Sequence, residues 1–352
     1  MKDIIPEFFR DFKCIASACR DNCCIGWEID IDEDTLTKYS ALKTPLGEKL
    51  SVSINKCDTP HFILGENERC PFLNSDNLCD IIIELGEENI PFICQNHPRF
   101  YTYLDGRREV GMGLCCQVAA ELVFSHKEPL DAKIPYPDTD SLEDALCYAR
   151  ERAFYILQDR KNDFFTRLMI FIEYCRELDN QLLFEDGEMI KQTAHDFAGN
   201  DLDRYGKCRD ISGICQFFNE LEPIDENWQK SATEIAENHE KIADYLPVFI
   251  KENKENIYKY EHISVYLTYR HFLSCIEDYS LDAIGDFVAI SVLYCIICDA
   301  YKSLTSGKFD TIETTMLYSK EVEYSQENTD CVMDFEEENL MEILYFLRQK
   351  ED

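Results

Sequence analysis

Cysteine is the residue type in this chain whose number and spacing could do chemistry. Ten of the 18 cysteines lie within residues 1–116, among glycines, prolines and asparagines, and the other eight are scattered over the rest of the 352 residues. The dense region contains Cys14-x4-Cys19-x3-Cys23-Cys24, then Cys57, Cys70, Cys79, Cys94 and Cys115-Cys116. Thiolates are soft ligands, and four of them complete a tetrahedral zinc site or an iron–sulfur cluster. We therefore predict a metal centre, with reduced thiols packed as small apolar residues as the alternative.

The spacing excludes several common metal motifs. It has neither the two Cys-x2-Cys pairs of a zinc ribbon nor the closely spaced run of a ferredoxin. It also lacks the Cys-x3-Cys-x2-Cys of radical S-adenosylmethionine enzymes. Cys57 has no matching context and is expected to be an ordinary thiol, and the Cys115-Cys116 doublet leaves the role of Cys116 open. Spacing alone leaves zinc and an iron–sulfur cluster as equal possibilities for the remaining eight cysteines: Cys14, Cys19, Cys23, Cys24, Cys70, Cys79, Cys94 and Cys115.

The composition of the chain indicates the cellular compartment and the kinds of binding partner to expect. The start of the chain has no basic segment followed by an apolar one, and the apolar run 287–298 is too short to span a bilayer, so we expect a cytoplasmic protein with reduced thiols. The formal net charge of −34 disfavours nucleic acid and anionic membranes as partners. It suits a basic partner such as a lysine-bearing substrate, or it is simply the solvated surface of a soluble protein.

The other motifs in the sequence give weaker indications of function. Gly111-Met112-Gly113 lacks the third glycine and the strand–turn–helix setting of a dinucleotide-binding loop, and we expect it to be a tight turn that delivers Cys115. Cys295-x2-Cys298 lies in an apolar helical run and is expected to be two buried thiols. The sequence has no Gly-x-Ser-x-Gly, His-Glu-x2-His or phosphate-binding loop, which leaves hydrolase, metalloprotease and nucleoside-triphosphatase functions without support.

The elements that must position the cysteines differ from those that follow them. Residues 1–128 have short apolar runs between turn residues, which predicts a small, loop-rich, cysteine-rich metal domain. Within it, 27–32 alternates apolar and acidic residues and could form a strand, while Asp32 or Asp34 is expected to cap a helix through Leu36 and Tyr39. The proline-bearing stretch 127–138 is expected to be a linker.

Beyond this stretch the apolar spacing is helical nearly throughout. A helix is expected to begin at Ser141, with Glu143 and Asp144 in its first turn. The helical windows are 141–180, 190–221, 227–250, 256–277, 281–303 and 335–349. We therefore predict a mainly α protein, in which the metal domain 1–128 is followed by an α-helical bundle domain, 138–352.

The cysteine motifs resemble those of the flagellin lysine-N-methylases. The resemblance covers roughly residues 8–122, and the helical remainder is similar only in character, most suggestively at Tyr266-x2-Tyr269-Arg270-His271-Phe272. The first half of the matching region also resembles a wider group of cysteine-rich domains that are described as zinc- or iron-chelating. A family member would carry Cys-Pro where this chain has Cys115-Cys116. The motifs are Phe12-x-Cys14-x4-Cys19-x3-Cys23-Cys24-x-Gly26-Trp27-x-Ile29-x-Ile31-Asp32, Cys70-Pro71-Phe72-Leu73-Asn74-x4-Cys79-x-Ile81, Leu85-Gly86-Glu87, Cys94-x3-Pro98-Arg99, and Cys115 followed by Ala119-Ala120.

The resemblance implies methyl transfer from S-adenosylmethionine to lysines of flagellin, with a 4Fe–4S cluster whose unligated iron holds the donor's amino and carboxylate groups. It is the resemblance, not the spacing, that favours iron over zinc. The rival hypotheses are a non-catalytic metal-binding or electron-transfer protein with a helical partner-docking domain, and a structural zinc that only holds the small domain together.

Lysine methylation requires a neutral ε-amine in a pocket that excludes water. Trp27, Tyr39, Tyr101 and Tyr103 are candidate pocket walls, although each taken alone is better explained as a core aromatic. Arg99 could clamp a carboxylate, or form a structural ion pair. Tyr39, Arg99 and Tyr101 are thus the candidate catalytic residues, and Trp27 and Arg99 the candidate donor-binding residues. His97 could ligate the metal, but beside the proline turn it is more often a capped surface histidine.

Overall fold

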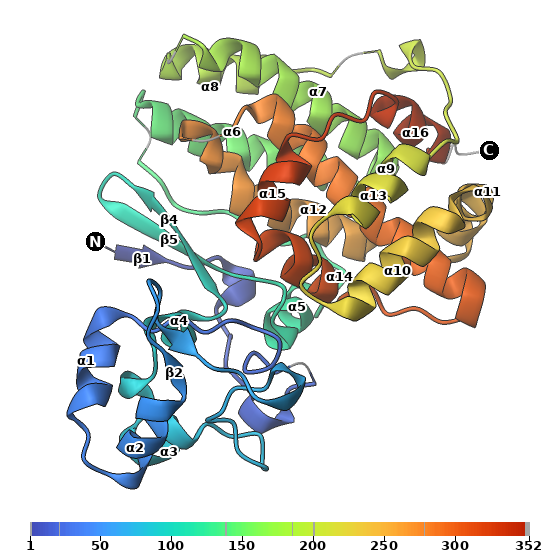
Figure 1. Ribbon diagram of the computed structural model, residues 1–352. Helices are drawn as coiled ribbons and strands as arrows, with labels where there is room; N and C mark the ends of the chain where they lie inside the picture. Colours follow the sequence, from blue (N-terminus) through green and yellow to red (C-terminus); the bar gives the residue numbers. More distant parts are fainter. Residues whose placement is uncertain are drawn as a thin grey trace. The chain divides into compact units, whose positions relative to one another are not determined.

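The computed structural model describes residues 2–20, 22–137, 139–184, 186–199, 201–277 and 279–348. Asp138, at the end of the expected linker, and the last residue of the window 335–349 lie outside these ranges. The described chain is mainly α-helical with few strands, which confirms the predicted fold class (Figure 1).

The chain divides into two compact units, and each is discontinuous in sequence. The cysteine unit comprises Phe12–Phe100 and Met112–Ala119, and the helical unit comprises Met1–Asp11, Tyr101–Gly111 and Ala120–Asp352. This division differs from the contiguous ranges 1–128 and 138–352 expected from composition. The reason is strand pairing, because the first strand pairs with one formed about a hundred residues later and both belong to the helical unit.

The cysteine unit is built from short elements joined by turns. Its two-stranded sheet pairs β2 with β3 in antiparallel fashion. The elements are η2 (Ala16–Ala18), α1 (Glu33–Ala41), α2 (Pro45–Val52), β2 (Ile54–Asn55), β3 (His61–Phe62), η3 (Glu66–Glu68), α3 (Asp80–Leu85), η4 (Glu87–Asn89) and α4 (Phe92–Asn96). α1 begins where the sequence predicted, because the Asp32 carboxylate accepts the N–H of Thr35.

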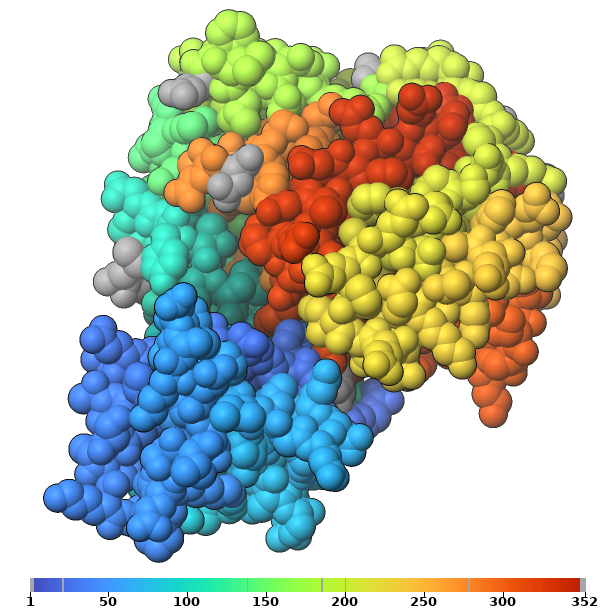
Figure 2. Space-filling view, in the orientation of Figure 1, coloured from blue at the N-terminus to red at the C-terminus, as the bar shows by residue number. Residues whose placement is uncertain are grey.

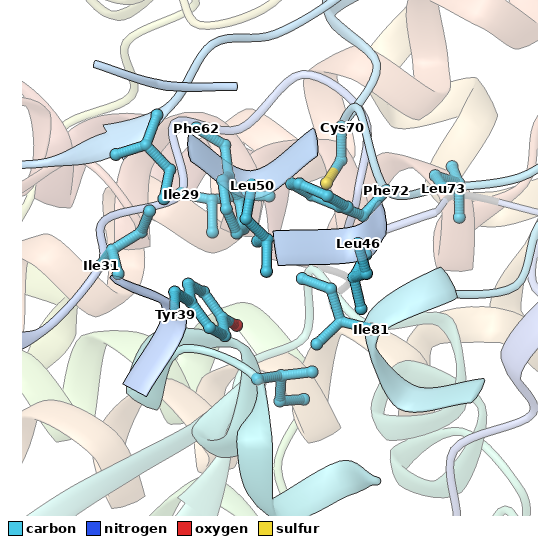
Figure 3. Close-up of a cluster of buried hydrophobic side chains, with 12 residues drawn as sticks. Ile29, Ile31, Tyr39, Leu46, Leu50, Phe62, Cys70, Phe72, Leu73 and Ile81 are labelled. Carbon is cyan, nitrogen blue, oxygen red and sulfur yellow. The ribbon is translucent and has the colours of Figure 1, made fainter. Parts of the chain in front are cut away.

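One core holds these short elements together. Figure 3 shows its buried side chains, in which Tyr39 of α1 faces Leu50 of α2 and Phe72 lies beside Cys70. The core consists of Ile29, Ile31, Tyr39, Leu46, Leu50, Ile54, Phe62, Cys70, Phe72, Leu73, Ile81 and Ile90. Cys24, Cys79 and Cys94 are partly buried against it, so the thiols are part of the packing of this unit.

A three-stranded sheet of order β1-β5-β4 was not expected from the sequence. β1 (Lys2–Ile4) runs parallel to β5 (Arg107–Met112), and β4 (Arg99–Leu104) joins β5 through a turn at Asp105 and Gly106, whose φ of 69° favours glycine. Gly111 and Met112 therefore belong to a strand and do not form the expected tight turn. The turn instead follows the strand and spans residues 113–116, where the Cys116 N–H donates to the Gly113 carbonyl.

The helical unit packs its other helices around α13 (Leu281–Ser306), whose neighbours are α7, α11, α12 and α14 (Figure 1). A Cβ at Gly285 would lie 2.9 Å from Cys175 Cβ, so α13 and α7 meet where the glycine leaves room. The other elements are η1 (Glu7–Phe9), α5 (Gln117–Val123), α6 (Leu142–Leu157), α7 (Phe164–Leu182), α8 (Gly187–Asp196), η5 (Leu202–Arg204), α9 (Ser212–Glu220), α10 (Glu226–Glu237), α11 (His239–Glu252), η6 (Lys254–Asn256), α12 (Ile257–His271), η7 (Phe272–Ile276), α14 (Thr311–Tyr318), the π-helix η8 (Ser319–Glu323), α15 (Gln326–Met333) and α16 (Leu340–Leu347).

α13 contains the expected buried thiols Cys295 and Cys298. The helix is longer than the apolar run suggested, and by length and composition it is sufficient to cross a membrane. However, 83% of its most apolar stretch is buried inside the protein, as in the core helix of a bundle. Figure 2 shows one outer face of the helical unit, where the yellow segment containing α9 and α10 adjoins the red C-terminal segment. Phe217 and Phe335 stack there with ring centroids 3.9 Å apart.

The stretch expected to be a linker is attached to the helical unit. Leu130, Ala132 and Ile134 alternate into the interior and are almost fully buried. The Gln158 side chain accepts the N–H of Leu130 and donates to its carbonyl. The prolines stop a helix here as predicted, but the alternating apolar residues make the segment part of the packing.

Candidate metal centre

Backbone pairing brings the first cysteine motif beside Cys70. The Cys70 N–H donates to the Cys24 carbonyl at 2.8 Å, and the Gly26 N–H donates to the Glu68 carbonyl at 3.1 Å. Gly26 has a φ of 72°, a conformation that glycine adopts without strain. These antiparallel contacts place the Cys23-Cys24 doublet next to Cys70, although 46 residues separate Cys24 from Cys70 in the sequence.

A closed loop then returns the chain from Cys70 to Cys79. The Leu73 N–H donates to the Cys70 carbonyl at 3.1 Å, and Leu73 forms an antiparallel bridge with Cys79. Inside the loop the Asn74 side chain accepts the N–H groups of Asp76 and Leu78. The asparagine thus satisfies the turn locally, and Cys79 comes to lie at the start of α3.

Cys94 is carried by α4, which is tied to the beginning of α1. One oxygen of Asp32 caps α1, and the other accepts the Phe92 N–H at 2.9 Å. The Gln95 amide donates to the Ile90 carbonyl at 2.7 Å. Burial opposes ionisation of Asp32, but the hydrogen bonds from Phe92 and Thr35 outweigh it and lower the pKa of this carboxyl. The single carboxylate therefore fixes two elements around the thiols.

Five thiols interact in this region: Cys23, Cys24, Cys70, Cys79 and Cys94. Burial raises the pKa of Cys94, and the nearby thiols of Cys70, Cys23 and Cys79 raise it further. The pKa of Cys24 is also raised, first by a hydrogen bond with Cys23 and by burial, then by Cys70 and Cys94. Burial, reinforced by Cys79, raises the pKa of Cys70 to about 11. Cys24, Cys70 and Cys94 thus hold their protons in this crowded group, and a bound cation would reverse this preference.

Cys116, the cysteine that the sequence left open, interacts with Cys19 and with Cys23 of the five thiols. Burial raises the pKa of Cys116 to about 11, and Cys19 and Cys23 contribute to the shift. The Gln117 side chain accepts the Arg20 N–H at 2.7 Å and ties the start of α5 to the segment containing Cys19. The doublet itself was the available signal, because adjacent residues in a turn can present either thiol.

Two other cysteines that the sequence predicts as ligands, Cys14 and Cys115, are not among the five interacting thiols. Cys115 is buried, while Cys14 is exposed and its sulfur accepts the Ala16 N–H at 3.4 Å. Among the described contacts, none joins Cys14 to another thiol. Cys57 is exposed and lies beside His61, apart from the five thiols. All-sulfur donors of the kind gathered around Cys70 suit either zinc or an iron–sulfur cluster.

Comparison with known proteins identifies relatives of the chain. No protein-family profile and no solved structure matches the chain. The flagellar biosynthetic protein FliU of Salmonella muenchen is 31% identical over 136 residues, which cover 79% of that protein and 35% of this chain. The chain belongs to the flagellin lysine-N-methylase family. The lysine-N-methylases of Salmonella choleraesuis and Salmonella typhimurium are each 32% identical over 136 residues. The chain spans about a third of the length of these two relatives.

Trp27 and His97 lie together in the cysteine unit of this member of the lysine-N-methylase family. Their rings meet edge to face with centroids 6.1 Å apart, and both side chains are half-buried. Burial lowers the pKa of His97 to about 4, so the imidazole is neutral at physiological pH. His97 is thus packed against an aromatic ring, which differs from the surface cap that the sequence also allowed.

The other candidate side chains are distributed between the units. Tyr39 is buried, and its hydroxyl donates to the Asn89 carbonyl at 2.8 Å. Burial raises the pKa of Tyr39, with a further contribution from Cys94 and Cys79, so the ring borders the five thiols. Arg99 is exposed and lies over the Phe12 ring at 5.5 Å. Tyr101 belongs to the helical unit, where Arg108 lies 4.7 Å from its ring centroid.

Proposed function

We propose that this chain is an S-adenosylmethionine-dependent protein-lysine N-methyltransferase that acts on flagellin, and that its cysteine unit holds a 4Fe–4S cluster. The observation that carries the proposal is the membership of a family whose relatives are named lysine-N-methylase and flagellar biosynthetic protein. The gathering of five thiols around Cys70 and Cys94 supports the cluster, because a resident soft metal accounts for so many cysteines in one small unit.

The ligands of the cluster are drawn from Cys23, Cys24, Cys70, Cys79 and Cys94. When bound, the cluster supplies a Lewis-acidic iron to which the amino and carboxylate groups of the methyl donor can bind. Tyr39, with its hydroxyl already engaged by Asn89, acts as a wall that keeps water from the thiols.

Trp27 is the aromatic face best suited to the target lysine. As the N–CH3 bond forms and the S–CH3 bond of the sulfonium donor breaks, the positive charge moves from sulfur to the lysine nitrogen, and a tryptophan ring attracts such an alkylammonium group. The neighbouring His97 is neutral, so it adds no positive charge that would repel that nitrogen. Reduced thiols require a reducing compartment, and we accordingly place the protein in the cytoplasm.

Anaerobic purification followed by elemental analysis and visible spectroscopy tests the metal. We expect about four irons per chain, with matching sulfide and a broad thiolate-to-iron absorption. Stoichiometric zinc without iron or visible absorption would remove the cluster from the proposal and leave a structural zinc site.

The methyl transfer is tested separately with intact protein. We expect flagellin incubated with the iron-loaded chain and S-adenosylmethionine to gain methyl groups on lysine, as measured by peptide mass spectrometry. The control omits the donor. An unchanged flagellin mass with the cluster intact would refute the methylase function and favour a non-catalytic metal protein.

A further inference from the structure

A second cluster of ligand-type side chains lies where residues 28–31 form an isolated antiparallel bridge with β3, on the face opposite the core. The Ile31 N–H donates to the Pro60 carbonyl at 2.7 Å, and the Phe62 N–H donates to the Ile29 carbonyl at 3.1 Å. The apolar side chains Ile29, Ile31 and Phe62 are buried in the core. Side chains alternate along extended backbone, so the intervening residues Asp30 and His61 face outward, as does Glu28.

These outward side chains converge. One ligand atom each from Glu28, Asp30 and His61 lies within 4.8 Å of the other two. Around His61 Nδ1 stand Glu28 Oε1 at 4.0 Å, Cys57 Sγ at 3.8 Å and the Thr59 carbonyl oxygen at 2.9 Å. Glu28, Asp30 and His61 thus present carboxylate and imidazole groups to one small region, and the Cys57 thiol adjoins it on the side of His61.

The negative charge around Glu28 and Asp30 favours binding of a cation. Glu28 and Asp30 place two carboxylates side by side, and among the described residues neither has a lysine or arginine partner. The side chain of Glu28 is 69% exposed and that of His61 is 20% exposed, so the region is open to ions from solvent. Like charges held this close are destabilising unless a cation lies between them.

The far side of the imidazole already has the partner that a metal-bound histidine needs. Asn55 on β2 pairs with His61 on β3, and its Nδ2 atom lies 3.3 Å from His61 Nε2. The Thr59 carbonyl 2.9 Å from Nδ1 can only accept a hydrogen bond, so without a metal the ring proton is on Nδ1. A metal at Nδ1 would replace this hydrogen bond and move the ring proton to Nε2, where the Asn55 amide, rotated by half a turn, would accept it. Such an outer hydrogen bond fixes the orientation of a ligating imidazole.

We propose that Glu28, Asp30, His61 and Cys57 form a binding site for one divalent ion of the zinc class, separate from the five-thiol centre. The mixture of nitrogen, oxygen and sulfur donors suits zinc and excludes calcium and magnesium, which take oxygen ligands. The ion would clamp the 55–62 hairpin to the segment before α1. This site is independent of the proposed methyl transfer.

Zinc binding by the full-length chain tests the site. The chain is loaded anaerobically with iron and sulfide, titrated with zinc chloride, desalted and analysed for both metals. We expect His61→Ala and Cys57→Ser to weaken binding of one zinc at least about tenfold, without changing iron content. The matched controls are His195→Ala and Cys331→Ser, at an exposed histidine and an exposed cysteine elsewhere, and they should bind zinc as the wild type does.

The outcomes separate this site from the iron centre. Unchanged zinc binding in His61→Ala would overturn the site, and unchanged binding in Cys57→Ser alone would overturn the four-residue ligand set. Loss of iron along with zinc would show that the hairpin belongs to the iron centre and is no separate site. An unchanged iron content also shows that each variant is folded, and failure to find iron in the wild type bears only on the proposed function.

Discussion

Glu321 shows how strongly burial can shift the ionisation of a single side chain in this protein. This carboxyl lies on the π-helix η8 and is fully buried. One oxygen accepts the Ile224 N–H at 2.7 Å, and the other has no hydrogen-bond partner among the described residues. Burial, with a smaller contribution from Asp225, raises the pKa of Glu321 to about 7, although the Ile224 hydrogen bond and Lys320 oppose the shift.

We expect Glu321→Gln to stabilise the protein at high pH. The folded state keeps a proton that the unfolded state loses near pH 4.5, so the wild-type free energy of unfolding falls as pH rises from about 4.5 to about 7. Glutamine has no proton to lose and keeps an oxygen for Ile224. The variant should therefore gain up to about 3 kcal/mol on the wild type between pH 5 and pH 8 in urea unfolding. A gain that is the same at both pH values would contradict this account.

The thiols allow a second test at this scale. We expect Cys23→Ser, Cys79→Ser and Cys94→Ser each to reduce bound metal and to destabilise the cysteine unit, since metal binding energy is folding energy in such a unit. Cys295→Ser and Cys298→Ser, buried in α13, should keep the wild-type metal content. Elemental analysis of the purified variants measures both. Metal loss in the α13 variants would show that the ligand group is drawn wrongly.

Residue type and spacing identified much of the candidate site, and the limits are physical. Cys70, Cys79 and Cys94 share turn-rich contexts that indicate ligands, and the structure brings them together. The proximity of Cys116 to Cys19 depends on backbone contacts between segments about a hundred residues apart. Likewise, only strand pairing places His61 opposite Asp30, so neither grouping leaves a local trace in the sequence.

At the scale of elements, Asp32 is a junction between two helices. Its oxygens accept the Thr35 N–H and the Phe92 N–H, each at 2.9 Å. We expect Asp32→Ala to lower the free energy of unfolding of the cysteine unit by about 2–3 kcal/mol, through one lost cap and one lost charge-assisted hydrogen bond. Thr44→Ala, which removes only the cap of α2, should cost about 1 kcal/mol.

The two tryptophans make this measurement specific to one unit. Trp27 lies in the cysteine unit and Trp228 in the helical unit. In a Trp228→Phe background, the fluorescence of Trp27 follows urea unfolding of the cysteine unit alone. Equal losses for the Asp32 and Thr44 variants would show that the hydrogen bond to Phe92 contributes nothing.

Local signals predicted helix starts better than helix ends. Ser141 caps α6 as expected, with its hydroxyl accepting the Asp144 N–H. The window 141–180 nevertheless contains two helices, because Asp163 starts a new one with its own cap. Residues 158–163 contain neither glycine nor proline, so helical spacing alone gave no reason to break the window.

The missed hairpin of β4 and β5 did leave a signal. Asp105-Gly106 is a favoured two-residue turn, and alternating aromatic residues precede it. By contrast, the pairing of β1 with β5 joins residues about a hundred positions apart and has no local signature.

For the whole molecule, the net charge of −34 bears on its encounter with a lysine-bearing substrate. An acidic surface attracts a basic target over distances that salt shortens to about 10 Å at 0.1 M. If flagellin is the substrate, we expect kcat/KM to fall several-fold as sodium chloride rises from about 10 mM to about 300 mM, mainly through KM. A peptide whose only positive charge is the target lysine is the control and should show less dependence on salt. An increase of kcat/KM with salt would contradict electrostatic attraction.

The interleaving of the two units has a consequence for biosynthesis. The cysteine unit is complete in sequence once residue 119 has been made, whereas the helical unit still awaits more than two hundred residues. β1 is synthesised first, yet its partner β5 follows only after the thiol-bearing segment. Because domains generally fold as they emerge from the ribosome, the thiols can gather while the helices are still being translated. Metal delivery to the nascent chain would then precede, and remain independent of, assembly of the helical unit.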